Sequence, residues 1–313
     1  MSTRPRWPDE PQDGQIGDIQ LLGEDAMQLR GSSAFYGRKL EPKLDLRLVN
    51  DWLELCEREH GARCEDPGES FDRDPRDLLV VDVERLCVAR LPPTAKFMAL
   101  SYCWPSSRTL QTNSGNLDIL QEPGSLRDRM SELPVVIQDT IKFVYQLGYQ
   151  YLWVDSLCII QDHEEQKKAQ IGQMDRIYSS AHMTIVPVIG SLDPDKACMG
   201  LPRFNPSIKC REQKIVTVQG RQLAVPFEAV DGLIHHRARW GTRAWTFQEH
   251  LLSQRILFLT ESQAYFQCRC NVFCEDCHGE IDTTYTRIEY KTSIGDPGLQ
   301  VTLKGILYFS FDP

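Results

Sequence analysis

Hydrophobic and polar residues in the middle of the chain form blocks that are typical of alternating strands and helices. The short apolar runs "LLVVDV" and "KFMALSYCW" are rich in β-forming residues and predict strands. "LPVVIQDTIKFVYQLG" predicts a helix, because Pro134 lies near its first turn, apolar residues recur at 137, 141, 144 and 145, and Gly148 ends it. "YLWVDSLCII" predicts the strand that follows this helix.

A second unit of the same kind comes next. "EEQKKAQIGQMDRIYSSA" predicts a helix with Ile171, Met174, Tyr178 and Ala181 on one face, and "MTIVPVIG" predicts another strand. Strands that alternate with helices form βαβ units, whose strands are parallel and whose helices cover the sheet. The expected fold class is therefore α/β, with a mostly parallel sheet flanked by helices.

The pattern changes beyond Gly190. "KIVTVQGRQLAV" predicts a β-hairpin that turns at Gln219-Gly220. "TRAWTFQEHLLS" predicts a short helix, and "RILFLTESQAYFQC" predicts a further pair of strands. We therefore expect an added β-hairpin region toward the C-terminus.

Both ends of the chain differ from this middle part. Residues 1–40 are rich in Pro, Gly, Asp and Gln and predict a flexible leader. Residues 44–70 predict a helical lead-in segment, with Leu48, Trp52, Leu55 and Cys56 along one stripe. The main domain is expected over 78–280. Residues 281–313 are a poorly defined segment, and their end soon after a fresh apolar run suggests a truncated gene model.

Composition narrows the classes of function. The 313 residues carry a net charge of −9 and no basic run interleaved with aromatic residues, which argues against nucleic-acid binding. No apolar run approaches the roughly 20 residues that span a bilayer, and the N-terminus lacks the apolar core of a secretory signal. We therefore expect a cytoplasmic protein whose eleven cysteines are mostly reduced.

Asp155 is the polar residue that stands out, because it interrupts an apolar run. A buried carboxylate without a partner is costly, so Asp155 needs either a partner or a role in function. Ligands in parallel α/β sheets bind beyond the carboxyl ends of the strands. Since "ALSYCW" and "WVDSLC" both turn polar as they proceed, we expect Ser101, Tyr102 and Asp155 to gather at one end of the sheet, facing a cleft.

The cysteines offer two further kinds of chemistry. Cys158 and His182 form a conceivable nucleophile pair, although nothing in the sequence indicates that Cys158 is activated. "CRCNVFCEDCH" supplies Cys268, Cys270, Cys274, Cys277 and His278, which could bind a structural zinc ion. "CEREHGARC" places Cys56, His60 and Cys64 on nearly one helical face, so this group could join the other. The alternative is a hairpin end with several reduced thiols.

Several long motifs together resemble a known family. "FMALSYCW", "LPVVIQDTIKFVYQLGYQYLWVDSLCIIQD", "QIGQMDRIYSSAHMTIVPV", "GLP" and "RAWTFQEHLLSQRILFL" occur in the order seen in fungal heterokaryon-incompatibility (HET) domains. The resemblance covers roughly residues 44–275; one departure is Pro105, where the family usually has Gly. It implies a cytoplasmic fungal protein of non-self recognition and regulated cell death. A self-associating protein is implied, with an NLR-type or other incompatibility protein as partner.

HET domains in turn resemble Toll/interleukin-receptor (TIR) domains, which have a flavodoxin-like sheet and in several cases hydrolyse NAD. The TIR catalytic glutamate lies four residues after a tryptophan, the spacing of Trp245 and Glu249 here, with Thr246 in place of the family's Cys. The resemblance implies that Glu249 is catalytic, that NAD is a substrate, and that no cofactor is permanently bound. The candidate NAD-binding residues are Ser101, Tyr102, Trp104, Asp155, Arg243 and Trp245, with Arg239 as the alternative to Arg243 for contact with the pyrophosphate.

Plainer interpretations stand beside these. Glu249 could be a solvent-facing carboxylate on an amphipathic helix, Trp104 and Trp245 could belong to the core, and Asp155 could be a cap or an ion-pair partner. TIR-like domains also act without catalysis, as modules that assemble through homotypic contacts. A zinc-stabilised, catalytically inactive fragment is a third alternative.

Overall fold

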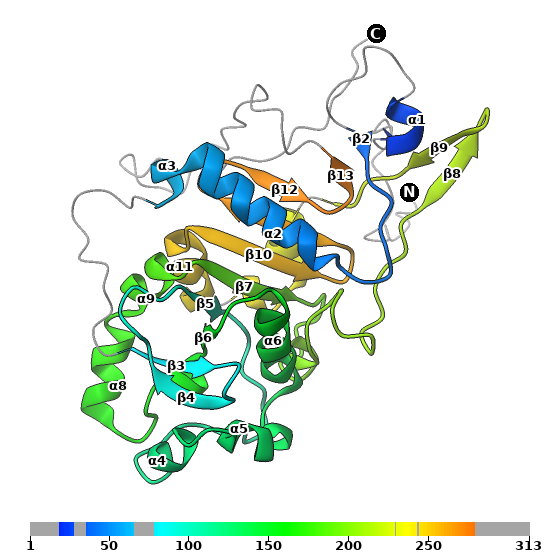
Figure 1. Cartoon of the computed structure of the whole chain (residues 1–313). Helices are drawn as coiled ribbons and strands as arrows, with labels where there is room; N and C mark the ends of the chain where they lie inside the picture. The colour runs from blue at the N-terminus through cyan, green and yellow to red at the C-terminus, as the bar shows by residue number, and fades with distance from the viewer. Residues whose placement is uncertain (1–18, 28–35, 66–77, 229, 243, 279–313) are drawn as a thin grey trace, which may run out of the picture.

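A mixed β-sheet runs through the centre of the molecule (Figure 1). The structure is a computed structural model that describes residues 19–27, 36–65, 78–228, 230–242 and 244–278. Within those residues the main sheet has eight strands, in the order β12-β11-β10-β7-β5-β6-β3-β4. Their bounds are β3 (Leu79–Asp82), β4 (Cys87–Arg90), β5 (Phe97–Leu100), β6 (Tyr151–Trp153), β7 (Met183–Val188), β10 (Arg255–Thr260), β11 (Ala264–Cys268) and β12 (Val272–Cys274).

The centre of this sheet is parallel and its two sides are antiparallel. β10, β7, β5 and β6 are parallel neighbours, with Ala99 opposite both Trp153 and Thr184. β11 and β12 continue the sheet antiparallel on one side, and β3 and β4 do so on the other. Every residue of β5, β7 and β10 is buried, as expected for strands that are covered on both faces.

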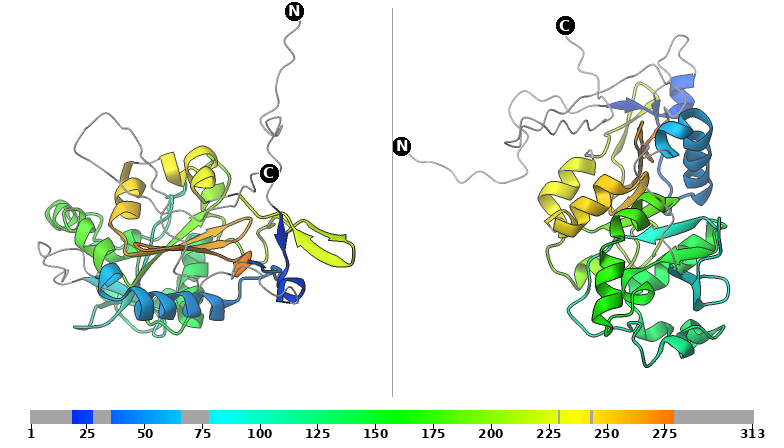
Figure 2. Two further views of the ribbon diagram at one scale, coloured as in Figure 1. Left: turned by 90° about the horizontal axis from the view of Figure 1, so that it is seen from above. Right: turned by 90° about the vertical axis from the view of Figure 1, so that its left-hand side faces the viewer.

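Helices cover both faces of the sheet (Figure 2). α2 (Leu46–Leu55) and α6 (Val135–Gln146) share one face, where Asn50 Nδ2 donates to the Leu147 carbonyl at 3.4 Å. α10 (Val230–Arg237) and α11 (Ala244–Leu252) lie on the opposite face, and α9 (Met174–Ser180) packs beside α11. The shorter helices are α3 (Ala62–Glu65), α4 (Leu117–Leu120), α5 (Ser125–Asp128), α7 (Asp155–Cys158), α8 (Glu164–Ile171), the π-helix η1 (Cys56–His60) and the 3₁₀ helices η2 (Met130–Glu132), η3 (Lys196–Cys198) and η4 (Trp240–Thr242).

The predicted α/β class is confirmed, with parallel strands at the centre of a mixed sheet. Two element predictions are wrong in detail. The run "YLWVDSLCII" is a strand only as far as Trp153, and Asp155 begins the short helix α7. The helix expected across 164–181 is interrupted at Gly172–Gln173, where glycine favours a break. Tyr145 and Ile171, both expected on buried faces, are 57% and 37% exposed.

A hairpin and a small sheet stand outside the main sheet. The predicted hairpin is confirmed as β8 (Ile215–Val218) and β9 (Arg221–Ala224), and Gln219 and Gly220 both have positive φ, at 52° and 78°. Such a turn matches the twist of the two strands.

Part of the stretch that was expected to be a flexible leader is built into the fold instead. β1 (Gln20–Leu21) pairs with β9, and β2 (Tyr36–Gly37) pairs with β13 (Cys277–His278). α1 (Gly23–Met27) lies between them. These short strands gain pairing partners that are distant in sequence, so local composition does not reveal them. Residues 1–18, 28–35 and the C-terminal segment 281–313 lie outside the described residues.

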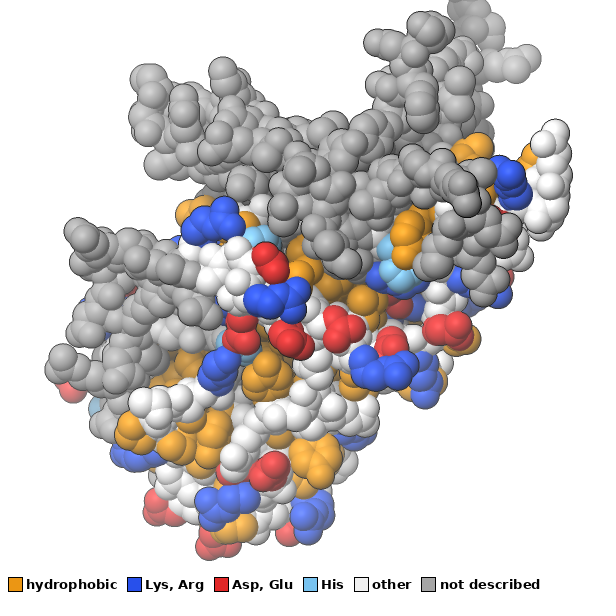
Figure 3. Space-filling view, turned by 45° about the horizontal axis from the view of Figure 1, so that its top comes forward, with side chains coloured by type: hydrophobic (Ala, Val, Ile, Leu, Met, Phe, Trp, Pro, Cys, Tyr) orange, Lys and Arg blue, Asp and Glu red, His pale blue; other side chains and the backbone are white. Residues whose placement is uncertain are grey.

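The surface drawn in Figure 3 shows acidic and basic side chains interspersed, without a large patch of one charge. α2 carries both signs of charge, since its exposed residues include Arg47, Asp51 and Glu54. Among the described residues, no helix has the length and apolar character that crossing a membrane requires.

Candidate functional site

Glu249 lies in the interior of the molecule, at the end of the parallel strands. Its residue is 8% exposed, and its Oε2 accepts a hydrogen bond from the hydroxyl of Ser101. Ser101 is itself buried and follows the last residue of β5, while Glu249 belongs to α11. The alternative interpretation of Glu249 as a solvent-facing carboxylate is therefore wrong: the helix directs Glu249 toward the carboxyl end of β5.

A buried tryptophan orients this pair. Trp240 Nε1 donates to Ser101 Oγ at 2.7 Å, which leaves the Ser101 hydroxyl proton directed at Glu249. Thr246, which stands where the resemblance to TIR domains implies a cysteine, is buried and donates its hydroxyl to the Trp240 carbonyl. Thr246 thus holds η4 against α11. Trp240 is not among the residues expected from the sequence, because no spacing rule connects it to Ser101.

Burial and the carboxylates of Glu249 and Asp155 raise the pKa of two tyrosines. Burial, together with the negative charges of Glu249 and Asp155, raises the pKa of Tyr178 well above its ordinary value. Burial, followed by the charge of Asp155, likewise raises the pKa of Tyr102. Both phenols therefore stay protonated at neutral pH and act as hydrogen-bond donors. Tyr178 was expected only as a residue on a helix face, and its place beside Glu249 comes from the packing of α9 on α11.

Asp155 has partners and is also partly accessible. Its Oδ2 accepts from Trp104 Nε1 at 2.6 Å, and its Oδ1 accepts from the Ser156 backbone N–H at 2.7 Å. Tyr102 donates to Ser156 Oγ at 3.1 Å. Trp104 and Asp155 are half-buried, whereas Ser101 and Tyr102 are buried. The structure thus brings Ser101, Tyr102, Trp104 and Asp155 to one end of the sheet.

Two of the candidate residues are only partly described or not described. The backbone of Trp245 lies in α11, but its side chain lies outside the described part of the chain, and Arg243 lies outside it altogether. Arg239, the alternative to Arg243, donates from Nη1 to the Leu192 carbonyl at 3.0 Å.

Cys158 and His182 do not form a nucleophile pair. Burial raises the pKa of Cys158 to about 12, so its thiol is neutral at physiological pH. Cys158 follows the carboxyl end of β6, whereas His182 precedes the first residue of β7, at the other end of the sheet. His182 instead contacts the Tyr149 hydroxyl at 3.1 Å.

The cysteine group "CRCNVFCEDCH" does not form one cluster. Cys268 lies with Cys56, His60 and Cys64, whose ligand atoms all lie within 4.8 Å of one another. The Cys277 thiol donates to the His278 carbonyl at 3.4 Å, and His278 contacts Arg38 and the ring of Tyr36. Cys270, from the same motif, is half-buried.

The two cavities described lie away from Glu249. The larger, of about 520 Å³, borders α2 and is lined by residues such as Arg38, Asp51 and His278. The other, of about 440 Å³, lies between α6 and the loop at Arg203. Neither is lined by Glu249, Ser101 or Asp155.

Comparison with known proteins identifies the family. Residues 97–249 match the family model "Heterokaryon incompatibility protein (HET)", from the first residue of β5 to Glu249. The chain therefore contains a HET domain over these residues.

This HET-domain protein is also similar to the Neurospora crassa protein named "Heterokaryon incompatibility protein 6, OR allele". The two are 28% identical over 121 residues, which is 36% of this chain and 17% of the relative. The match thus spans less than a fifth of that relative's length. No solved structure matches the chain.

Proposed function

We propose that this HET-domain protein is a cytoplasmic effector of fungal non-self recognition and regulated cell death that hydrolyses NAD at the nicotinamide–ribose bond, with Glu249 as the catalytic carboxylate. The observation that carries the proposal is the position of Glu249: it is buried, oriented by Ser101, and directed at the carboxyl end of the central strand β5.

The order of the parallel strands supports a TIR-like, flavodoxin-like fold. Numbered along the chain, β5, β6, β7 and β10 lie in the order 2-1-3-4, which is the order of flavodoxin-like sheets. Ligands bind such sheets at the point where the strand order reverses, between the first and third strands. β5 and β7 are those strands here, and Ser101 continues β5 by donating its backbone N–H to the Ile185 carbonyl of β7. The carboxylate of Glu249 therefore lies beside the expected ligand position.

Hydrolysis of the nicotinamide–ribose bond requires a carboxylate near the ribose but no covalent intermediate with the protein. Nicotinamide leaves NAD as a neutral molecule from a cationic ring, and positive charge develops on the ribose. A nearby carboxylate stabilises this oxocarbenium-like sugar, as in glycoside hydrolysis. The hydrogen bonds from Trp240 to Ser101 and from Ser101 to Glu249 hold the carboxylate in one orientation, so little reorganisation is needed when the charge develops.

The half-buried residues are assigned to substrate binding. Asp155 is proposed to accept hydrogen bonds from a ribose hydroxyl, and Trp104, which it holds at 2.6 Å, to stack on a ring of the dinucleotide. Trp245 is proposed as a second stacking residue, and Arg243 as the residue that meets the pyrophosphate. Because Glu249 is 8% exposed, we propose that a local rearrangement admits the substrate to its carboxylate. We therefore propose that activity appears when the chain is concentrated or clustered.

The test is release of nicotinamide from NAD by the concentrated or clustered full chain. Wild type is expected to release nicotinamide, and Glu249→Gln is expected to lose activity by at least about 100-fold, the scale of one essential electrostatic or acid–base group. Glutamine keeps the size of the side chain and can still accept from Ser101, so the fold is expected to persist. Glu122→Gln, at an exposed glutamate distant in sequence, is the matched control and is expected to keep full activity.

A non-enzymatic assembly module is the second candidate function. It is favoured by the internal contacts of Glu249, which already engages Ser101 and acts on Tyr178 inside the protein. In that case wild type and Glu249→Gln release nicotinamide equally, at background level, while both are folded and self-associate alike by light scattering. That result would exclude the hydrolase and leave homotypic assembly, with an NLR-type or other incompatibility protein as the proposed partner.

A further inference from the structure

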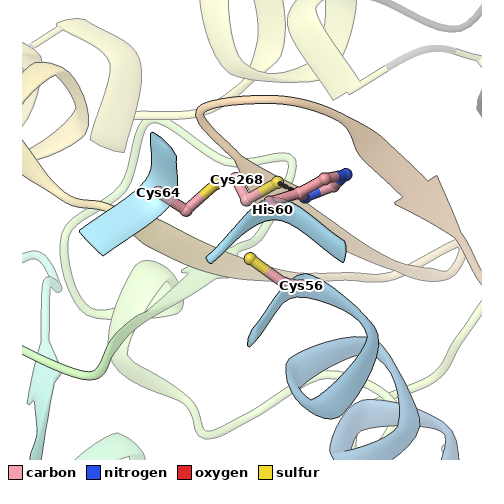
Figure 4. A group of neighbouring side chains, drawn as sticks. All are labelled: Cys56, His60, Cys64 and Cys268. Atoms are coloured by element: carbon pink, nitrogen blue, oxygen red, sulfur yellow. Dashed lines mark hydrogen bonds between the residues drawn. The ribbon is translucent and has the colours of Figure 1, made fainter. Parts of the chain in front are cut away.

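Four buried side chains with metal-binding atoms converge at one point of the structure (Figure 4). They are Cys56, His60, Cys64 and Cys268, and their exposures are 0%, 9%, 0% and 6%. The four ligand atoms lie within 4.8 Å of one another. The Cys268 sulfur is 3.3 Å from His60 Nδ1.

A π-helix and a glycine turn in the backbone bring Cys56, His60 and Cys64 together. After α2 the helix widens into the π-helix Cys56–His60, which the Gly61 N–H closes onto the Cys56 carbonyl at 3.2 Å. Gly61 has a φ of 41°, and the turn it makes brings Cys64 of α3 back to Cys56 and His60. Such π-helical turns occur frequently at functional sites.

Cys268 arrives from the opposite end of the chain. It is the last residue of β11, at the turn into β12, where its backbone N–H donates to the Asn271 carbonyl at 2.8 Å. The Asn271 N–H in turn donates to the Cys268 sulfur at 3.2 Å. A backbone N–H that points at a cysteine sulfur stabilises the thiolate form, which is the form that binds metal.

The donor set fits zinc. Three cysteines and one histidine are a common ligand set of structural zinc sites, with Zn–S near 2.3 Å and Zn–N near 2.0–2.1 Å. Ligand atoms around such a tetrahedral ion lie about 3.5–3.8 Å apart. A group that already lies within 4.8 Å needs only small side-chain movements to reach this geometry. Four protein ligands leave no open position, so the site is structural and not catalytic.

The charge around the cluster also fits a negatively charged zinc–thiolate group. Zinc with three thiolates and a neutral histidine carries a net charge of −1. The guanidinium of Arg255, which is 2% exposed, donates from Nε to the Cys56 sulfur at 3.3 Å and from Nη1 to the His182 carbonyl at 3.4 Å. This guanidinium balances the charge of the zinc–thiolate group, which in turn offsets the cost of burying an arginine.

We propose that Cys56, His60, Cys64 and Cys268 form a structural zinc site that joins the two flanks of the HET domain. Cys56, His60 and Cys64 precede the family-matched residues 97–249, and Cys268 follows them. The ion thereby fastens the lead-in helix α2 and its π-helical end to the antiparallel side of the sheet. The site is independent of the proposed chemistry at Glu249.

Metal analysis of the full chain, purified under reducing conditions, tests this site. Wild type is expected to hold about one zinc ion per chain. Cys64→Ser and Cys268→Ser are expected to weaken zinc binding by more than about 100-fold, since even partners outside the ligand set contribute 10–100-fold. The matched controls are Cys270→Ser and Cys277→Ser, which remove cysteines outside the cluster and are expected to keep full zinc content.

A second measurement covers the case in which a ligand variant does not fold. Cobalt added to reduced, metal-stripped wild type is expected to give the visible absorption of a tetrahedral cobalt–thiolate site, and zinc is expected to abolish it. Reduced wild type that is folded, free of zinc and colourless with cobalt overturns the proposal. So does loss of zinc in the Cys270→Ser and Cys277→Ser controls, or a disulfide within the four residues of the purified protein.

Discussion

Asp155 and Glu249 show how differently single carboxylates can be predicted. Asp155 interrupts an apolar run, and its expected place near a strand end follows from that local pattern; it begins α7, directly after β6. Glu249 shows no such contrast, since a short amphipathic helix can carry a glutamate on either face. Its burial depends on Ser101 and Trp240, which are 148 and 9 positions away in sequence. Only contacts between distant elements place Glu249 in the interior.

His182 is expected to make the stability of the protein depend on pH. Burial, with the positive charges of Lys96 and Arg255, lowers its pKa from 6.5 to about 4, although Glu57 acts in the opposite direction. Between these values the unfolded chain binds more protons than the folded one. The contribution of His182 is therefore complete above about pH 6.5, and about 3 kcal/mol is lost as the pH falls toward 4.

Urea denaturation of wild type and His182→Gln at pH 7.5, 6 and 5 measures this contribution. Glutamine keeps a hydrogen-bonding group near the Tyr149 hydroxyl but does not titrate. The stability of His182→Gln is expected to fall less between pH 7.5 and 5 than that of wild type. Parallel curves for the two proteins would show that His182 titrates normally in the folded state.

At the scale of elements, the conformation of Gly200 explains why the "GLP" motif begins with glycine. The "GLP" turn has Gly200 at a φ of 136°, a conformation that other residues rarely adopt. A Cβ at this position would lie 2.4 Å from Asp139 Oδ2 and 2.7 Å from Asn205 Nδ2. The same Asp139 oxygen accepts from the Leu201 N–H at 3.1 Å and joins the turn to α6.

Gly200→Ala is therefore expected to destabilise the fold by about 1–3 kcal/mol, through both backbone strain and the displaced Asp139. Gly148→Ala is the matched control, because Gly148 has a φ of 87° but no atom near its missing Cβ. Chemical denaturation of both variants separates the two effects. Equal losses of stability in the two variants would show that contact with Asp139 contributes nothing.

Elements also differ in how far local pattern predicts them. β7 and the β8–β9 hairpin follow from an apolar run and from a Gln-Gly turn, and both occur as expected. Apolar residues lie on both sides of Asp155 and Ser156 between Tyr151 and Ile160, so the pattern does not show that the strand ends at Trp153 and that α7 begins. The paired strands β1 and β2 have two residues each and no pattern of their own.

At the scale of the whole molecule, the buried pair Arg203–Glu275 connects parts of the chain that are far apart. Arg203 Nη2 lies 2.5 Å from Glu275 Oε1, and Nε lies 3.2 Å from Oε2. The same guanidinium donates to the carbonyls of Glu41 and Pro42. Removing one partner leaves a buried charge without its counterion, so Glu275→Gln and Arg203→Met are each expected to cost about 3–5 kcal/mol.

A double-mutant cycle measured by urea denaturation checks this pair. The double variant is expected to be less destabilised than the sum of the single variants, because it leaves neither charge buried alone. Arg129→Met and Glu132→Gln, which form an ion pair on the surface, are the control and are expected to change stability by less than about 1 kcal/mol. Additive effects at Arg203 and Glu275 would contradict a direct interaction.

The sequence by itself determined the α/β class, the succession of the central strands and helices, the hairpin turn and the family, because these rest on local periodicity, turn chemistry and motifs in a given order. The tertiary structure decided which distant side chains meet. Ser101 reaches Glu249, and Cys268 joins Cys56, His60 and Cys64 in place of its neighbours Cys270 and Cys274. The reason is geometric: strand order, and the face of the sheet on which each helix packs, set distances between residues that no local pattern contains.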